Sequence, residues 1–315
     1  MPNKGRIIYA CPDNPNPSGG VRRLYRHVEI LTRNGVEAYV MHQSRAFAIT
    51  WFETDAKILY LDDRPEFLPT DTIVISEVMT RLMIDLRSSV AKRIVYALNW
   101  ANIFKYMPIG INWPKLGITE AIAGSQYERH FILESMGIDA PVIASGTDST
   151  LFSPAPEKHL QIAYMPRKEW LAPAILGTFR SMCPEHCMVP FVEIGSASHK
   201  EVAKYLTKAA IFLSATFPEG LARPPLEAMA SGCIVVGFNG RGAAEYMKHG
   251  YNCYVAEDGD ILGAVHGLKR AVEEIQTGAA QPMAAAARAT ALQYDLATEE
   301  KRVLSYWERR LSLVG

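Results

Sequence analysis

The sequence predicts an α/β protein with two doubly wound, Rossmann-like domains that face each other across a cleft. Three observations lead to this prediction. The 315 residues are enough for about two domains. Short, continuous apolar runs alternate with segments of helical periodicity nearly from end to end, which is typical of parallel sheets buried on both faces. Residues 152–158 contain two prolines and are predicted to form a linker.

The apolar runs are the predicted strands. Those of the first domain are residues 6–11, 37–42, 72–77, 93–99, 121–125 and 141–145. Those of the second domain are residues 161–165, 189–194, 210–214, 233–238 and 253–256. We therefore expect one domain over residues 1–152 and another over residues 153–315, with the last helix free to pack back on the first domain. In such sheets, ligands bind beyond the carboxyl ends of the strands.

Composition restricts the class of protein. Hydrophobic residues make up 49% and charged residues 21% of the chain, and the formal net charge is +0. No global basic excess suggests nucleic acid. No apolar run approaches the ~20 residues that span a bilayer, and residues 7–11 are too short for a signal peptide. Five irregularly spaced cysteines suit a reduced compartment. We expect a cytoplasmic protein, with peripheral contact at the inner membrane face left open.

The first strand leads into a glycine-containing turn that opens a helix. Gly19 and Gly20 let the backbone approach a ligand, and the following helix start offers N–H groups to an anion. A plain flexible turn is the alternative. The apolar stripe of this helix leaves Arg22, Arg23 and Arg26 to one side. We expect these arginines to form a solvated face, with contact to anionic lipid as the alternative.

The second domain offers two further groups of residues. Arg167 and Lys168 directly follow its first strand, where they can meet a diphosphate; otherwise they are two surface cations. Strand 210–214 leads into loop 215–222 and then a helix. Glu219 lies in that loop, and Glu227 is expected in the first helical turn. Their carboxylates can accept hydrogen bonds from sugar or ribose hydroxyls. The alternative makes Glu227 a favourable partner of the helix dipole.

Taken together, these segments resemble retaining glycosyltransferases of the GT-B fold, specifically glycosyltransferase family 4. FPEGLARPPLEAMASGCIVVGFNGRGAAEYMKHGYNCYV is similar to the family's donor-binding signature, including the two glutamates with seven residues between them. VIASGTDSTLFSP is similar to its interdomain passage, and SGGVRRLYRHVEILTRNGVEAYV to its first loop and helix. The resemblance covers both ends of the chain and is strongest over residues 208–257.

The resemblance implies a nucleotide-diphosphate sugar donor bound by the second domain and an acceptor bound mainly by the first. It assigns the sugar hydroxyls to Glu219, the ribose to Glu227, and the diphosphate to Arg167 and Lys168. Further donor-binding residues implied in this way are Gly19, Gly20, Gly220, Leu221 and Ala222. The charge that develops on the leaving diphosphate would be stabilised electrostatically.

Three features depart from the family's pattern. Asn99 stands where many members carry a histidine at a strand end. Because asparagine cannot act as a general base, a mechanism in which the leaving phosphate accepts the acceptor's proton suits this chain better. Arg167 and Lys168 are adjacent, whereas the family spaces this pair further apart. The first domain is also short, which leaves the class of acceptor open.

Other motifs are expected to be structural. Asp258-Gly259-Asp260 has the D-x-D form of a metal site, but Asp260 suits a helix N-cap. Cys183, His186 and Cys187 lack a partner pair of cysteines for zinc. His42, at a strand end, is expected at the surface. We therefore expect neither a metal nor another cofactor.

The expected activity is transfer of a hexosyl group, with retention, from a nucleotide-diphosphate sugar to a hydroxyl of a glycan, a lipid-linked glycan or a small molecule. Two alternatives remain. One is a non-catalytic nucleotide-sugar-binding subunit that scaffolds a glycan-assembly complex, and the other is a sugar-nucleotide epimerase of the same fold. The sequence leaves open the base, the sugar, the acceptor and the oligomeric state.

Overall fold

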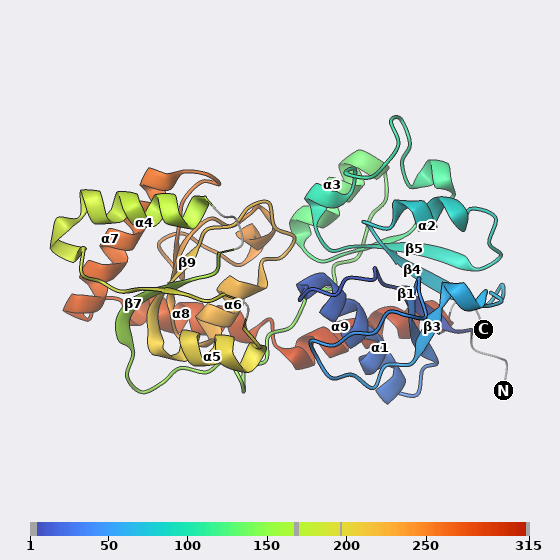
Figure 1. The fold of residues 1–315 in the computed structure, drawn as a ribbon, viewed down its shortest axis with the longest axis horizontal. Helices are drawn as coiled ribbons and strands as arrows, with labels where there is room; N and C mark the ends of the chain where they lie inside the picture. The colour runs from blue at the N-terminus through green and yellow to red at the C-terminus, as the bar shows by residue number, and fades with distance from the viewer. Residues whose placement is uncertain (1–4, 167–169, 196, 313–315) are drawn as a thin grey trace. The chain divides into compact units, whose positions relative to one another are not determined.

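The computed structural model describes residues 5–166, 170–195 and 197–312 of the chain. They form two compact α/β units (Figure 1). Unit 1 comprises Met1–Ala144 together with Glu299–Gly315, and unit 2 comprises Ser145–Thr298. The division thus precedes the expected linker at residues 152–158, and the last helix counts with the first unit.

Unit 1 is built on a six-stranded, wholly parallel sheet in the order β3-β2-β1-β4-β5-β6. Its strands are β1 (Ile7–Ala10), β2 (Ala38–His42), β3 (Ile58–Tyr60), β4 (Thr72–Ser76), β5 (Lys92–Ala97) and β6 (Ala121–Ala123). Strand order reverses between β1 and β4, which makes their carboxyl ends the switch point where ligands bind in such sheets.

Helices cover both faces of this sheet. Alternate residues of each strand point to opposite sides, so Ile7 and Tyr9 share a core with α1 (Gly19–Arg33) and α9 (Leu296–Ser312). Ile8 and Ala10 share the opposite core with α2 (Thr80–Asp85) and α3 (Gln126–Met136). Figure 1 shows α1 and α9 together on one side of the strands and α2 and α3 on the other.

Residue Trp307 fixes α9 to unit 1. Its side chain is 1% exposed, and its indole N–H donates to the Tyr9 hydroxyl at 3.0 Å. Tyr9 in turn bonds to the buried ring of His27, with 3.1 Å between the hydroxyl and Nδ1. Burial, aided by the nearby Arg23 and Arg26, lowers the pKa of His27 well below its usual value, so the ring is neutral.

Unit 2 has a five-stranded parallel sheet in the order β11-β10-β9-β7-β8. Its strands are β7 (His159–Tyr164), β8 (Phe191–Glu193), β9 (Ala209–Ser214), β10 (Ile234–Gly237) and β11 (Cys253–Val255). The switch point lies between β7 and β9. The prediction of two doubly wound α/β domains is confirmed.

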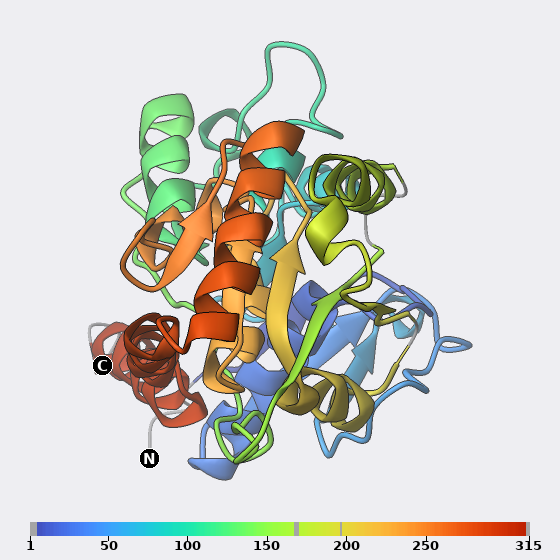
Figure 2. The ribbon, with the colours of Figure 1, turned by 90° about the vertical axis from the view of Figure 1, so that its left-hand side faces the viewer.

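The helices of unit 2 also form two layers. On one face, α4 (Leu171–Met182) and α7 (Ile261–Thr277) share a core with the strands; Figure 2 shows α7 running beside them. On the other face, α6 (Arg223–Ala230) contacts α5 (His199–Lys208), α8 (Gln281–Leu292) and strands β9 and β10. The α6 helix ends as predicted, with Ser231 as its C-cap and Gly232 at φ +77°.

For unit 1, the sequence prediction misses one strand and places another where the structure has none. The missed strand is β3, whose residues are apolar but number only three and are half-buried at the sheet edge. Conversely, residues 141–145 form only an isolated bridge, between Val142 and Ala123. Apolar burial beside β6 explains that run without a strand, since Ile143 packs in the core shared with α1.

The passage that begins unit 2 packs against the turn before α9. The Thr147 N–H donates to the Tyr294 carbonyl at 2.7 Å. A side chain at Gly146 would meet the Asp295 carbonyl oxygen, 2.6 Å from an added Cβ, so only glycine fits there. The start of unit 2 and the segment that returns to unit 1 are therefore fastened together. None of the described helices combines the length and apolar character needed to cross a membrane.

Candidate functional site

In unit 2, the switch point is bordered by loop 215–222, which follows β9 and leads into α6. Residue Glu219 lies in this loop, as predicted, and is partly exposed. The segment after β7 forms the other border of the switch point. Two predicted residues of that segment, Arg167 and Lys168, lie outside the described residues.

A second loop, residues 239–242, holds Glu219 in place. The Glu219 N–H donates to the Gly240 carbonyl at 3.0 Å, and the Gly240 N–H donates to Asp258 at 2.9 Å. The two loops approach so closely that a Cβ on Gly242 would lie 1.4 Å from the Gly220 carbonyl oxygen. Gly240 also has φ +58°. The two glycines therefore allow a contact that presents Glu219 from a braced backbone.

The backbone of Gly220, Leu221 and Ala222 presents N–H groups that are available to a ligand. In the described part of the chain, no acceptor is recorded for the N–H groups of these three residues. The Ala222 carbonyl, by contrast, accepts a hydrogen bond from the Tyr246 hydroxyl, and Ala222 has φ +58°. Successive N–H groups beside a helix start suit an anion such as a phosphate.

Residue Glu227 is buried, at 4% exposure. Because α6 begins at Arg223, Glu227 lies beyond the first turn, so its expected position in that turn is wrong, and the alternative of a dipole partner there fails with it. Its carboxylate instead pairs with Arg223, at 2.8 Å. Sequence reasoning missed Arg223, although its i,i+4 spacing to Glu227 was a usable signal.

In unit 1, the turn after β1 opens α1 as predicted. Ser18 caps the helix by accepting from the Val21 N–H, and Gly19 has no atom within 4 Å of an added Cβ. At Gly20, an added Cβ would lie 3.2 Å from Leu98 of the segment after β5. The structure therefore brings the glycines and the Asn99 turn to the same sheet edge.

Residue Asn99 begins the short 3₁₀ helix η2 (Trp100–Asn102). Its side-chain oxygen accepts from the Ala101 N–H at 3.0 Å, which is the geometry of an N-cap. Its backbone N–H donates to Glu77 at 3.1 Å. Asn99 thus shapes the turn at the carboxyl end of β5.

Sequence reasoning missed Glu77, the residue directly after β4 at the unit 1 switch point. It is 1% exposed, and its carboxylate accepts from the backbone N–H groups of Leu98 and Asn99, each at 3.1 Å. Burial raises the pKa of Glu77 to about 7, although these hydrogen bonds act in the opposite direction. The signal was a lone carboxylate at the end of the apolar run TIVIS.

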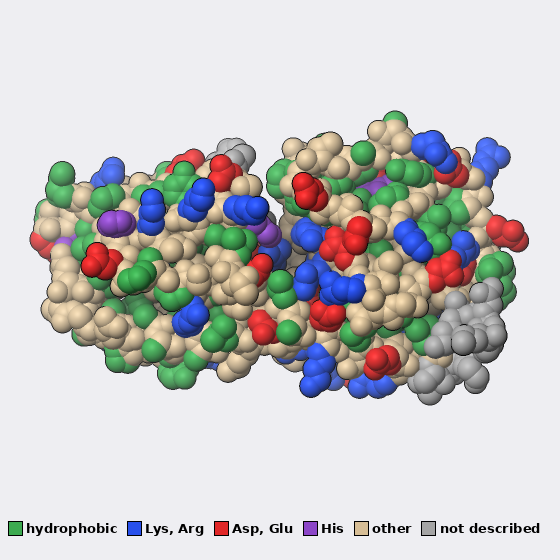
Figure 3. Space-filling model, turned by 90° about the horizontal axis from the view of Figure 1, so that it is seen from below, with side chains coloured by type: hydrophobic (Ala, Val, Ile, Leu, Met, Phe, Trp, Pro, Cys, Tyr) green, Lys and Arg blue, Asp and Glu red, His purple; other side chains and the backbone are tan. Residues whose placement is uncertain are grey.

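The basic side of α1 is not solvated as expected. Arg23 is 6% exposed, Arg22 pairs with Glu29 at 2.9 Å, and Arg26 pairs with Glu299 of α9. The expectation failed because Arg26 meets α9, a helix distant in sequence, and Arg23 lies over the Tyr96 ring of β5. Figure 3, which looks onto the face carrying α1 and α9, shows basic and acidic side chains intermingled there.

The expectation of a surface histidine at position 42 is also wrong. His42 is 1% exposed. Its ring bonds to the Tyr25 hydroxyl at 2.7 Å and to Asp13 at 2.8 Å. Burial lowers the pKa of His42, although Asp13 acts in the opposite direction.

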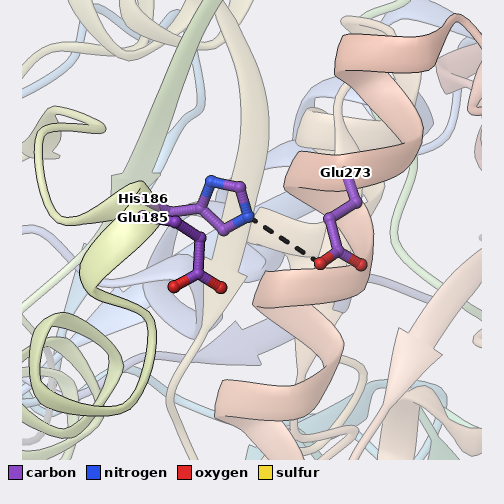
Figure 4. A group of neighbouring side chains, drawn as sticks. All are labelled: Glu185, His186 and Glu273. Atoms are coloured by element: carbon purple, nitrogen blue, oxygen red, sulfur yellow. Dashed lines mark ion pairs between the residues drawn. The ribbon is translucent and has the colours of Figure 1, made fainter.

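The motifs set aside as structural take ordinary roles. Asp260 caps α7 by accepting from the Gly263 N–H, as predicted, and Asp258 holds the Gly240 loop. Near the C-P-E-H-C motif, His186 points toward Glu273 with Glu185 beside it (Figure 4). Lys269 lies 3.1 Å from Glu185 and 3.9 Å from Glu273, so a cation already occupies the middle of these carboxylates.

A hollow of about 440 Å³ in unit 1 lies away from the switch point. Arg6, Glu37 and Asp71 line it, and each of them immediately precedes a strand. It therefore opens at the amino ends of the strands. Arg6 and Asp71 form an ion pair there, at 2.6 Å. This ion pair joins the segments before β1 and β4, at the sheet edge opposite the unit 1 switch point.

The sequence of this chain matches a known protein family and a curated relative. Residues 191–289 match the family described as Glycosyl transferases group 1. The chain is 30% identical over 271 residues to an alpha-1,6-glucosyltransferase from Actinobacillus pleuropneumoniae serotype 7, covering 81% of this chain and 78% of that protein.

Solved structures share the fold. A glycosyltransferase from Rickettsia africae has a TM-score of 0.72 at 16% identity, covering 98% of both chains. Anabaena HepE, solved with UDP and glucose, has a TM-score of 0.72 at 17% identity, covering 97% of this chain and 100% of that one.

The two parallel-sheet units, each with its switch point, have the GT-B fold that these solved glycosyltransferase structures share. The A. pleuropneumoniae relative, which is 30% identical over 81% of this chain, shows which protein family the chain belongs to. It belongs to the group 1 glycosyltransferases.

Proposed function

We propose that this enzyme is a retaining member of glycosyltransferase family 4 that transfers a hexosyl group from a uridine-diphosphate sugar to an acceptor hydroxyl. The observation that carries the proposal is the unit 2 loop, where Glu219 stands next to three N–H groups without a recorded acceptor in the described chain. Two names support the choice of donor: HepE was solved with UDP and glucose, and the A. pleuropneumoniae relative is called a glucosyltransferase.

In this proposal, each group has a separate task. The N–H groups of Gly220 to Ala222 bind the diphosphate, and Glu219 accepts hydrogen bonds from hydroxyls of the transferred sugar. Glu227, held by Arg223 at 2.8 Å, accepts the ribose hydroxyls. Binding that strengthens as charge moves onto the departing diphosphate lowers the barrier of transfer. The family resemblance adds Arg167 and Lys168 as cations for the same charge.

The acceptor's proton needs a destination. The Asn99 amide has no basic atom, and its oxygen already accepts from the Ala101 N–H. We therefore propose that the leaving phosphate oxygen takes the proton as the acceptor oxygen attacks from the same face, which gives retention without a protein base. The family resemblance adds Gly19 and Gly20 to the donor-binding residues, and in this proposal no metal is required.

Replacement of Glu219 by Ala tests the proposal directly. We expect transfer from UDP-glucose to fall by at least about a hundredfold, because a transition-state contact is removed. The matched control is Glu257→Ala, which removes an exposed carboxylate from the same sheet edge and should leave the rate unchanged. Near wild-type transfer by the Glu219 variant would contradict the assignment.

Donor and stereochemistry require separate measurements. UDP-sugars held above their dissociation constants should raise the melting temperature, and GDP-sugars should not. The anomeric configuration of the product, read by NMR, distinguishes retention from inversion, and activity in EDTA checks metal independence. A new nucleotide-sugar formed from donor alone would instead indicate an epimerase, and donor binding without any turnover would indicate a scaffold subunit.

A further inference from the structure

The chain between η2 and the 3₁₀ helix η3 (Pro114–Leu116) forms a loop that protrudes from unit 1 and is drawn in teal near α3 in Figures 1 and 2. Its side chains are unusually apolar for an exposed segment. Phe104, Tyr106 and Ile109 are 42%, 55% and 104% exposed. A cluster of large apolar groups in water is unfavourable unless something covers it.

This loop is held in shape. Ile103 and Trp113, at its two ends, are fully buried, and Met107 and Ile111 pack against the core shared with α3. The Met107 N–H donates to the Phe104 carbonyl at 3.2 Å. These four side chains anchor the loop, while Phe104, Tyr106 and Ile109 are presented outward.

Aromatic rings continue the surface at the base of the loop. Phe131 of α3 lies 6.3 Å from the Phe104 ring and 5.7 Å from the Trp100 ring, centroid to centroid. Tyr127 lies 5.2 Å from Trp100. Amphipathic aromatic rings of this kind suit the interface between water and lipid headgroups.

The loop and its stem carry cations and no carboxylate. Residues 99–119 contain two Lys and no Asp or Glu, in a chain of net charge +0. Lys105 and Lys115 belong to the loop and its stem, and both are exposed. The Lys115 ammonium donates to the Gly110 carbonyl at 2.6 Å, so one cation is fixed beside the tip. Flanking cations attract an anionic surface.

We propose that residues 104–110 dock unit 1 onto an anionic lipid bilayer. Ile109 enters the headgroup region, Phe104 and Tyr106 lie at its boundary, and the two lysines face acidic headgroups. The loop starts just after the Asn99 turn, at the carboxyl end of β5. A docked membrane would therefore lie near the sheet edge where we place the acceptor. The surface itself does not depend on the proposed sugar transfer.

Vesicle flotation of the full chain tests this inference. We expect binding to vesicles of phosphatidylcholine with phosphatidylglycerol, and much less to phosphatidylcholine alone. Ile109→Asp should weaken binding by at least about tenfold. Lys105→Glu should weaken binding only to the anionic vesicles, and added salt should do the same. The matched control is Met188→Asp, since Met188 is 88% exposed but lies in unit 2.

Melting temperatures of all variants must stay near the wild-type value, so that unfolding cannot explain lost binding. The inference is overturned if the wild type binds neither vesicle, or if the Ile109 and Met188 variants bind as well as the wild type. It is also overturned if the wild type is a dimer that Ile109→Asp separates, because a second copy would then cover the loop. Failure of sugar transfer in the wild type would count against the proposed function and leave the vesicle result standing.

Discussion

Among the single residues of this enzyme, Glu77 carries an unusual energetic cost. Its carboxylate is buried and accepts from two backbone N–H groups without a cation paired to it among the described side chains. Burial raises its pKa to about 7. Residues with such shifts cluster at functional sites, and Glu77 lies where the unit 1 sheet reverses its strand order.

This shift predicts how stability depends on pH. In the unfolded chain, Glu77 ionises near pH 4.5, whereas in the folded protein it keeps its proton up to about pH 7. The folded state therefore binds more protons between these values. The free energy of unfolding should fall as pH rises through this window, by up to about 3 kcal/mol from this group, and change no further above it.

Glu77→Gln should remove that contribution. Urea unfolding at pH 4.5 and pH 7.5 would show a smaller pH-dependent loss of stability in the variant than in the wild type. Glu134→Gln, at an exposed position of α3, provides the matched control and should follow the wild type. Equal pH dependence of all three proteins would show that Glu77 does not titrate as its burial implies.

Between elements, the contact of loops 215–222 and 239–242 determines where Glu219 stands. A methyl group at Gly242 would overlap the Gly220 carbonyl oxygen, which is 1.4 Å from the added carbon. Gly242→Ala should push the loops apart, cost about 1–3 kcal/mol of stability and abolish binding of UDP. Calorimetric titration with UDP and urea unfolding measure the two effects.

Residue Gly177 gives the matched control for this change. It lies within α4, and no atom lies within 4 Å of an added Cβ. Gly177→Ala should stabilise the helix by about 0.5–1 kcal/mol and leave UDP binding intact. Unchanged UDP binding by the Gly242 variant would mean that the brace between the loops is not needed for the donor.

Sequence patterns predicted most elements and the position of Glu219 in loop 215–222, for physical reasons that also explain the misses. Strands buried on both faces are continuous apolar runs, and glycines, prolines and caps mark helix ends, as at Ser18 and Gly232. The edge strand β3 was missed because its apolar run is short and only half-buried. Arg26 was misjudged because its partner Glu299 lies on α9, which is distant in sequence. Glu77 was overlooked because a strand-end carboxylate looks solvated until the next strand's turn closes over it.

At the scale of the whole molecule, α9 links the two units along the chain. The helix starts at Leu296, and from Glu299 it counts with unit 1. Trp307→Ala should cost unit 1 about 3–5 kcal/mol by emptying a core position and leaving the Tyr9 hydroxyl short of a donor. Hydrogen exchange should show lost protection in β1 and β4, with β9 unchanged.

Residue Glu308 provides the control on the same helix. Its side chain is exposed, so Glu308→Ala should leave hydrogen exchange as in the wild type. Equal loss of protection in both units of the Trp307 variant would indicate that they unfold as one cooperative body rather than as two.

The returning helix also determines the order in which the protein can mature on the ribosome. Residues Met1–Ala144 emerge first, yet their core stays open until Val303 and Trp307 have been translated. At about 5–20 residues per second, that interval lasts on the order of ten to thirty seconds. All of unit 2 emerges within this interval, so the C-terminal unit can be folded before the N-terminal one is complete. The nascent chain must keep one apolar face of the first sheet from aggregating until its own last helix arrives.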